Sequence, residues 1–135
     1  MDWTTSPSDD GQRPMKSQKR ILIVDDDADV LLFLRDRLNA LGFEVLTAAN
    51  GKEGIEALQH HTVNGVLLDL CMPVMGGLLM LEQLAQSSTL PPVIVMSPSE
   101  HRPEMQLAII KGAMDYLIKP IAPDVLTDKC LRLFY

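Results

Sequence analysis

Five short runs of apolar residues alternate along the chain with segments in which apolar positions recur every three or four residues. The runs are ILIV (21–24), FEVLTA (43–48), VNGVLLDL (63–70), PPVIVM (91–96) and DYLI (115–118). Runs of this length, rich in Val, Ile and Leu, predict strands. Their strict alternation with helical patterns predicts an α/β domain built on a parallel sheet.

The first helical segment has the clearest pattern. Leu31, Leu34, Leu38 and Leu41 form one apolar stripe, and Gly42 follows as a C-cap. We therefore expect a crossover helix between the first and second strands.

Four more helices are expected between and after the remaining strands. The second begins at the Asn50-Gly51 turn, the third covers 77–86, the fourth covers 103–111 and ends at Gly112, and the fifth begins near Pro123. Their expected inward-facing residues are Ile55 and Leu58 in the second, Leu78, Leu81 and Leu84 in the third, Leu107 and Ile110 in the fourth, and Val125, Leu126 and Leu133 in the fifth.

Composition refines this picture. Residues 1–19 have the polar composition of a disordered tail, which leaves one domain from 20 to 135. Two cysteines without zinc-like spacing indicate free thiols in a reducing compartment. Neither a signal peptide nor an apolar run of membrane-spanning length is present, so we expect a soluble, cytoplasmic protein. A net charge of -6 argues against direct nucleic-acid binding.

Polar residues stand where the predicted strands end. Asp25 and Asp26 follow the first strand, Asp69 the third, Ser97 the fourth and Lys119 the fifth. In doubly wound sheets, ligands bind beyond the carboxyl ends of the strands, so these groups are expected to converge. Crowded carboxylates raise one another's pKa unless a cation holds them. Mg²⁺, or Mn²⁺ in its place, is the cofactor that such oxygen ligands suit.

Four motifs in this order carry a family resemblance: ILIVDDD, VLLDLCMPVMGG, VIVMS and DYLIKP. Together they resemble the receiver domain of bacterial two-component response regulators, from Arg20 to about Phe134. The resemblance implies a flavodoxin-like (βα)5 fold, a doubly wound five-stranded parallel sheet with strand order 2-1-3-4-5. It also implies that Asp69 accepts a phosphoryl group from a phosphohistidine, as a signalling phospho-acceptor and not as an enzyme.

The resemblance assigns a role to each residue of the expected metal site. Asp26, Asp69 and the backbone carbonyl of Cys71 correspond to direct Mg²⁺ ligands, and Asp25 to an acid that helps to hold the ion.

The remaining assignments concern the switch. Lys119 is similar to the lysine that pairs with a phosphoryl oxygen, and Ser97 to the residue whose hydroxyl turns toward that group. Tyr116 is similar to the aromatic residue whose inward or outward rotamer reports the state of the hydroxyl residue. Pro120 resembles the proline preceded by a cis peptide bond. Ser99, with Cys71, stands where the family modulates dephosphorylation.

One departure from the family pattern lies directly after Ser97. Pro98 stands where a small residue is usual, and proline lacks the backbone N–H that is thought to bind the phosphoryl group in relatives. We expect weaker phosphoryl stabilisation or a stiffer loop.

Two other functions remain open from the sequence. Asp25 and Asp27 also satisfy the Asp-x-Asp start of haloacid-dehalogenase-type phosphatases, with Asp25 as nucleophile and Asp27 as acid. The second alternative is a degenerate receiver that acts only as a protein-interaction module, and Pro98 is the strongest sequence feature in its favour. A nucleotide-binding fold is disfavoured because the first loop is acidic and lacks a glycine-rich phosphate cradle.

The resemblance implies partners as well. A sensor histidine kinase or a histidine phosphotransfer protein supplies the phosphoryl group, and a downstream effector protein or domain reads the switch. The expected contact surface is the face of the fourth helix, fifth strand and fifth helix, which also offers a homodimer interface. No membrane contact is expected. The sequence does not decide between a stand-alone receiver and a piece of a longer regulator or hybrid kinase.

Overall fold

The computed structural model describes residues 18–72, 74–86, 90–99 and 103–135. The predicted tail lies outside these ranges except for its last two residues, Gln18 and Lys19. Both contact the domain: the Gln18 side chain donates to the Gly42 carbonyl at 3.1 Å, and the Lys19 carbonyl accepts from the Glu44 N–H at 2.9 Å.

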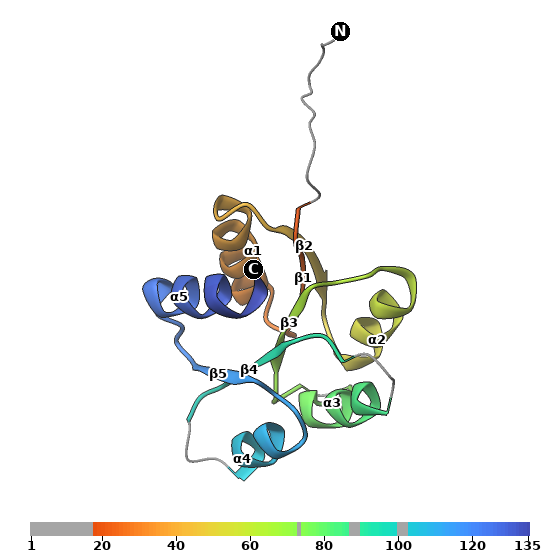
Figure 1. Cartoon of the computed structure of the whole chain (residues 1–135). Coiled ribbons are helices and arrows are strands. Elements are labelled where there is room, and N and C mark those ends of the chain that lie inside the picture. Colours follow the sequence, from red (N-terminus) through yellow and green to blue (C-terminus); the bar gives the residue numbers. More distant parts are fainter. Residues whose placement is uncertain (1–17, 73, 87–89, 100–102) are drawn as a thin grey trace, which may run out of the picture.

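Five strands and five helices alternate along the chain (Figure 1). The strands are β1 (Arg20–Val24), β2 (Glu44–Ala48), β3 (Gly65–Asp69), β4 (Val93–Ser97) and β5 (Asp115–Ile118). The helices are α1 (Ala28–Ala40), α2 (Gly51–His60), α3 (Gly77–Ala85), α4 (Pro103–Ile110) and α5 (Pro123–Phe134). Each overlaps the segment that the hydrophobic pattern predicted for it, although β1 begins one residue before the run 21–24 and β4 ends one residue after the run 91–96.

All four strand pairings are parallel, and the order across the sheet is β2-β1-β3-β4-β5. This confirms the predicted doubly wound fold. The register pairs Val24 with Leu68, Asp69 with Met96, and Ser97 with Ile118. The carboxyl ends of β1, β3, β4 and β5 therefore meet along one edge of the sheet.

Alternation along each strand divides the core into two layers. One face carries Ile21, Ile23 and Leu67 against α1 and α5, whereas the other carries Leu22 and Val66 against α2, α3 and α4. Figure 1 shows the same division, with α1 and α5 on one side of the sheet and the other three helices opposite. Both faces are covered, so the central strands are apolar throughout, as is usual for parallel sheets.

Local signals fix the ends of the helices. The Asp27 carboxylate accepts from the N–H groups of Asp29 and Val30 and caps α1, and the Asn50 side chain caps α2. Gly42 and Gly112 follow α1 and α4 with φ of 97° and 120°, a region that residues with a Cβ rarely adopt.

The predicted inward faces of two helices need correction. In α4 the side chains of Leu107 and Ile110 are 42% and 79% exposed, while Met105 and Ala108 are buried. Almost every residue of α4 after its first turn is apolar, so periodicity could not select the face that packs on the sheet. The other corrected position is Val125 in α5, which is exposed, whereas Leu78 in α3 is half-buried and packs against the core as predicted.

Among the described residues, no helix has both the length and the apolar character needed to cross a membrane. Both cysteines are free, as predicted, with Cys71 exposed and Cys130 buried.

Candidate functional site

The three aspartates expected at the carboxyl ends of β1 and β3 do meet. One carboxylate oxygen from each of Asp25, Asp26 and Asp69 lies within 4.8 Å of the other two. Asp25 is fully buried and Asp69 is 3% exposed, whereas Asp26 faces the solvent. The carboxylates of Asp25 and Asp69 thus have little water around them, and their charge must be balanced by neighbours.

Lys119 provides the opposite charge. Its Nζ donates to Oδ2 of Asp25 at 2.7 Å and lies 3.4 Å from Oδ2 of Asp69. Burial lowers the pKa of Lys119, but the hydrogen bond to Asp25 and the charge of Asp69 outweigh it, so the pKa is raised overall. The lysine is therefore an ammonium ion at neutral pH, and it bridges the ends of β1 and β3 from the end of β5.

Backbone N–H groups hold the remaining carboxylate oxygens. The N–H of Asp27 donates to Oδ1 of Asp25 at 2.9 Å, and the N–H of Cys71 donates to Oδ1 of Asp69 at 3.1 Å. Each buried carboxylate thus has one N–H donor and one contact with the ammonium of Lys119. Both side chains are fixed before any ligand arrives.

Burial raises the pKa of Asp69 from 3.8 to about 6, and the neighbouring charge of Asp25 adds to this rise. The N–H of Cys71 and the ammonium of Lys119 act in the opposite direction without cancelling it. At neutral pH the group is mostly ionised, which an attacking carboxylate has to be.

The raised pKa makes a testable prediction about stability. A carboxyl group whose pKa is higher in the folded protein stabilises the fold below pH 3.8, and this stabilisation is lost as pH rises through about 6. Asp69→Asn removes the charge, so near neutral pH, without added metal, we expect the variant to have a higher free energy of unfolding than the wild type. Urea unfolding at two pH values checks this: the difference should shrink as pH falls toward 4, and an equal difference at both would contradict it.

The end of β4 contributes Ser97, which is fully buried. Its hydroxyl donates to the Ser99 carbonyl at 3.1 Å and accepts from the Ser99 N–H at 3.3 Å, across an exposed Pro98. Ser97 is therefore bonded within its own turn in this state. Sequence reasoning placed Ser97 at the edge of the site but gave no indication of this local pairing.

Two further predicted residues lie on β5 and directly after it. The peptide bond between Lys119 and Pro120 is cis, and the Lys119 N–H donates to the Ser97 carbonyl at 2.9 Å. Tyr116 is half-buried, with its ring beside α4 and under the ammonium of Lys129 on α5. The sequence did not predict the contact between Lys129 and the Tyr116 ring, because a lysine in an amphipathic helix normally indicates only a solvated face.

This geometry does not favour the alternative of a haloacid-dehalogenase-type phosphatase. Asp27, which would act as its acid, uses its carboxylate to cap α1, and Asp25, which would act as its nucleophile, is fully buried against Lys119.

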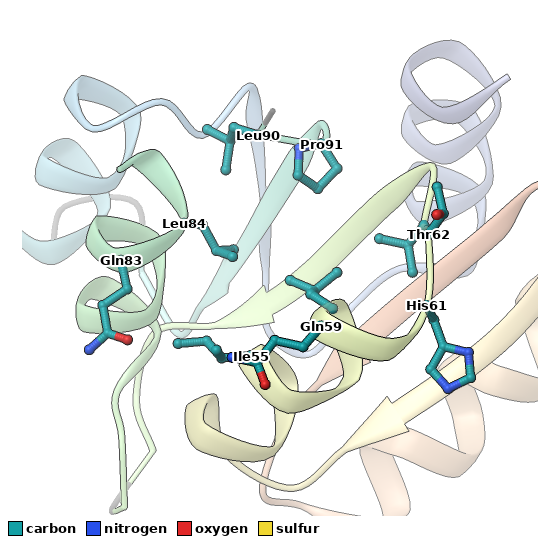
Figure 2. A pocket seen from close by; sticks show the side chains of 10 residues that line it. Ile55, Gln59, His61, Thr62, Gln83, Leu84, Leu90 and Pro91 are labelled. Atoms are coloured by element: carbon teal, nitrogen blue, oxygen red, sulfur yellow. The ribbon is translucent and has the colours of Figure 1, made fainter. Parts of the chain in front are cut away.

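A hollow of about 590 Å³ lies well away from the acids (Figure 2). It is lined by Ile55 and Gln59 of α2, Gln83 and Leu84 of α3, and Leu90 and Pro91 before β4. These residues surround the amino ends of β3 and β4, at the opposite edge of the sheet from Asp69. The acidic cluster, rather than this hollow, brings together the groups that can do chemistry.

Comparison with known proteins identifies the family. The response regulator receiver domain family matches residues 21–131. PrrA of Mycobacterium tuberculosis, a transcriptional regulatory protein, is 37% identical over 101 residues, which are 75% of this chain and 43% of PrrA. A probable transcriptional regulator of Cyanidium caldarium, ycf27, is 33% identical over 108 residues, which are 80% of this chain and 43% of ycf27. The chain thus spans less than half the length of these relatives.

Solved structures of receiver domains resemble this fold. A CheY-like receiver domain protein from Methanospirillum hungatei has a TM-score of 0.81 and 31% identity, covering 86% of this chain and 93% of that protein. The chemotaxis response regulator CheY4 of Vibrio cholerae has a TM-score of 0.81 and 26% identity, covering 87% and 99%. With the fold, the strand-end acids and the family match in agreement, the chain belongs to the receiver domain family of the response regulators of two-component signalling.

Proposed function

We propose that Asp69 accepts a phosphoryl group from the phosphohistidine of a sensor kinase or histidine phosphotransfer protein. One observation carries this proposal: the carboxylate of Asp69 stands at the carboxyl end of β3 with Lys119 and two other aspartates beside it. An acid in that position is both a nucleophile and part of a cation site.

The reaction needs few groups from the protein. An oxygen of Asp69 attacks the phosphorus, the phosphorus–nitrogen bond to the donor histidine breaks, and that nitrogen keeps the bonding electron pair. An acyl phosphate results. Lys119 offsets the charge of the transferred group, because positioning and charge stabilisation are nearly all that phosphoryl transfer requires.

The donor set fits a hard divalent cation. Three carboxylate oxygens within 4.8 Å of one another are the ligands that Mg²⁺ or Mn²⁺ prefers. We assign Asp26, Asp69 and the Cys71 carbonyl as direct ligands, with Asp25 supporting the ion. When bound, the ion neutralises phosphoryl charge in the transition state.

The switch follows from rearrangement at β4 and β5. A phosphoryl group on Asp69 offers new acceptors to Lys119 and to the Ser97 hydroxyl, which must leave the Ser99 carbonyl to reach it. The space that Ser97 and its loop vacate then admits the ring of Tyr116. Phosphorylation thus shifts a population between two arrangements.

The experiment is incubation with acetyl phosphate and Mg²⁺, followed by intact-mass measurement, with Asp69→Asn as the control. We expect one phosphoryl adduct on the wild type and none on the variant. An adduct of equal yield on Asp69→Asn would exclude Asp69 as the acceptor. Sustained hydrolysis of phosphate monoesters would instead favour an enzyme.

Pro98 makes a second prediction for the same assay. Because proline has no N–H, the phosphoryl group has one donor fewer than in relatives with another residue there. Pro98→Ala restores that donor, and we expect a longer acyl-phosphate lifetime, by about two- to tenfold for one hydrogen bond worth about 0.5–1.5 kcal/mol. The decay of the adduct after removal of acetyl phosphate measures the lifetime, and an unchanged decay would contradict the role given to Pro98.

The degenerate-receiver alternative makes a contrasting prediction. A site that has lost its function should not respond to Mg²⁺, so a titration followed by NMR separates it from the phospho-acceptor. The clustered acids and the paired Lys119 favour the responsive site.

Two arguments support the proposed partner surface: the family resemblance and the exposure of apolar side chains. Exposed apolar side chains of α4, of the turn before β5 and of α5 include Ile109, Ile110, Met114 and Val125. Such a patch is typical of a contact surface. We propose that a downstream effector or a second copy binds there in the cytoplasm, and that this domain itself contacts neither nucleic acid nor membrane.

A further inference from the structure

Lys129 of α5 makes three interactions around the start of β5. Its Nζ lies 2.9 Å from Oδ1 of Asp115, 2.5 Å from the carbonyl oxygen of Tyr116, and 4.4 Å from the centroid of the Tyr116 ring. The Lys129 side chain is only 18% exposed. An ammonium at this distance over an aromatic face, and partly shielded from water, is in cation–π range.

The place of Lys129 in the fold explains how one side chain reaches all three groups. β5 is an edge strand, so no strand of the described part of the chain pairs with its outer side. Leu117 packs on the α5 face of the sheet, whereas Tyr116 packs on the opposite face with α4. Lys129 therefore reaches around the edge of β5 and joins α5 to a ring on the other face.

The ring of Tyr116 is half-buried and lies at the surface of the domain beside α4. It borders a hollow of about 340 Å³ whose other walls are Met105, Gln106, Ile109 and Ile110 of α4. Movement of the ring toward Ser97 takes it inward, away from the edge where the ammonium lies. The cation–π contact would be weakened by that movement.

We propose that Lys129 is a positioning residue that holds Tyr116 in its outward position and so opposes the switch. This inference rests on the proposed function of Tyr116 and Ser97. Asp115 anchors the ammonium, and the Tyr116 carbonyl fixes its distance from the ring. Loss of the positive charge favours the inward ring, and with it the arrangement that accepts the phosphoryl group more readily.

The rate of phosphorylation by acetyl phosphate tests the proposal. We expect Lys129→Met to raise the rate by at least about two- to fivefold, because a cation–π contact that is partly shielded from water is worth at least as much as an exposed one. Lys129→Arg keeps a cation over the ring and should stay close to the wild type. Lys111→Met is the matched control, because it removes a lysine whose ion pair with Glu82, at 2.8 Å, joins the end of α4 to α3 and does not involve Tyr116.

A double-mutant cycle distinguishes positioning from general support of the edge strand. If Lys129 acts through the ring, Lys129→Met should have no effect on the rate in a Tyr116→Leu background. An undiminished effect in that background, or no effect in the wild-type background, would overturn the proposal.

A spectroscopic measurement works without phosphorylation. The chain has two tyrosines, so 3-fluorotyrosine labelling gives two resonances, and Tyr135→Phe assigns them. We expect Lys129→Met to reduce the H₂O/D₂O isotope shift of the Tyr116 resonance, because the ring moves inward. An unchanged isotope shift rejects the proposed positioning role of Lys129, whereas failure of acetyl phosphate to phosphorylate Asp69 in the wild type rejects the proposed function.

Discussion

Gly77→Ala is expected to destabilise the domain by about 3 kcal/mol, the upper part of the range for overpacked sites. A Cβ at Gly77 would lie 2.1 Å from the carbonyl oxygen of Asp69 and 2.9 Å from Cα of Leu70. Both atoms belong to the backbone, so no side chain can rotate away. Either α3 or the end of β3 must move, and the move displaces Asp69, the proposed acceptor. Urea unfolding and the acetyl-phosphate rate measure the two consequences.

The neighbouring glycine provides the control. A Cβ at Gly76 would have Leu70 O at 3.6 Å as its nearest neighbour, which is an ordinary contact. Gly76→Ala should therefore cost about 1 kcal/mol or less, as expected when alanine replaces glycine at an N-cap. Equal losses for the two variants would show that helix-start preference, and not the approach to Asp69, makes Gly77 necessary.

Lys119→Met is expected to have the second large effect, a loss of about 2–4 kcal/mol near neutral pH and of most phosphorylation activity. The variant keeps the apolar stem but leaves the buried carboxylates of Asp25 and Asp69 without a cation. The loss should shrink at acid pH, because the carboxylates then take up protons. Unfolding at two pH values and the yield of acyl phosphate check both parts.

Two variants test the explanation for Lys119. Lys111→Met removes a half-exposed ion pair and should change stability by less than about 1 kcal/mol. Lys119→Arg keeps the charge in a bulkier, planar group, so it should recover stability better than activity. If Lys119→Met were as stable as the wild type at neutral pH, the buried aspartates would not depend on the ammonium.

The hydrophobic pattern predicted the fold well because its signals are local. Five apolar runs predicted the five strands, and Gly42 and Gly112 marked the ends of two helices. A strand that is buried on both faces must be apolar along its length, and a helix C-cap with positive φ favours glycine. These requirements can be read from neighbouring residues alone.

The candidate site could also be assembled in outline before the structure. In a parallel sheet the carboxyl ends of the strands meet at one edge. Asp25, Asp69 and Lys119 could therefore be assigned to one site, although Asp25 and Lys119 are 94 residues apart in the sequence. The strand order itself came from the family resemblance. No sequence pattern could give the distances, the burial of Asp69 or the resulting rise of its pKa.

The amino-acid sequence by itself determined the order of strands and helices along the chain and the residues that cap the helices. It also determined which carboxylates, lysine and hydroxyl stand at the strand ends. Each of these features depends on the periodicity or chemistry of nearby residues. Only the tertiary structure decided which face of α4 is buried, how Ser97 pairs with Ser99, and that Lys129 reaches Tyr116. The α4 face and the Lys129 contact depend on how α4 and α5 pack around β5, and the Ser97 pairing depends on the conformation of the turn after β4. In none of these cases does the spacing of residues along the chain specify the arrangement.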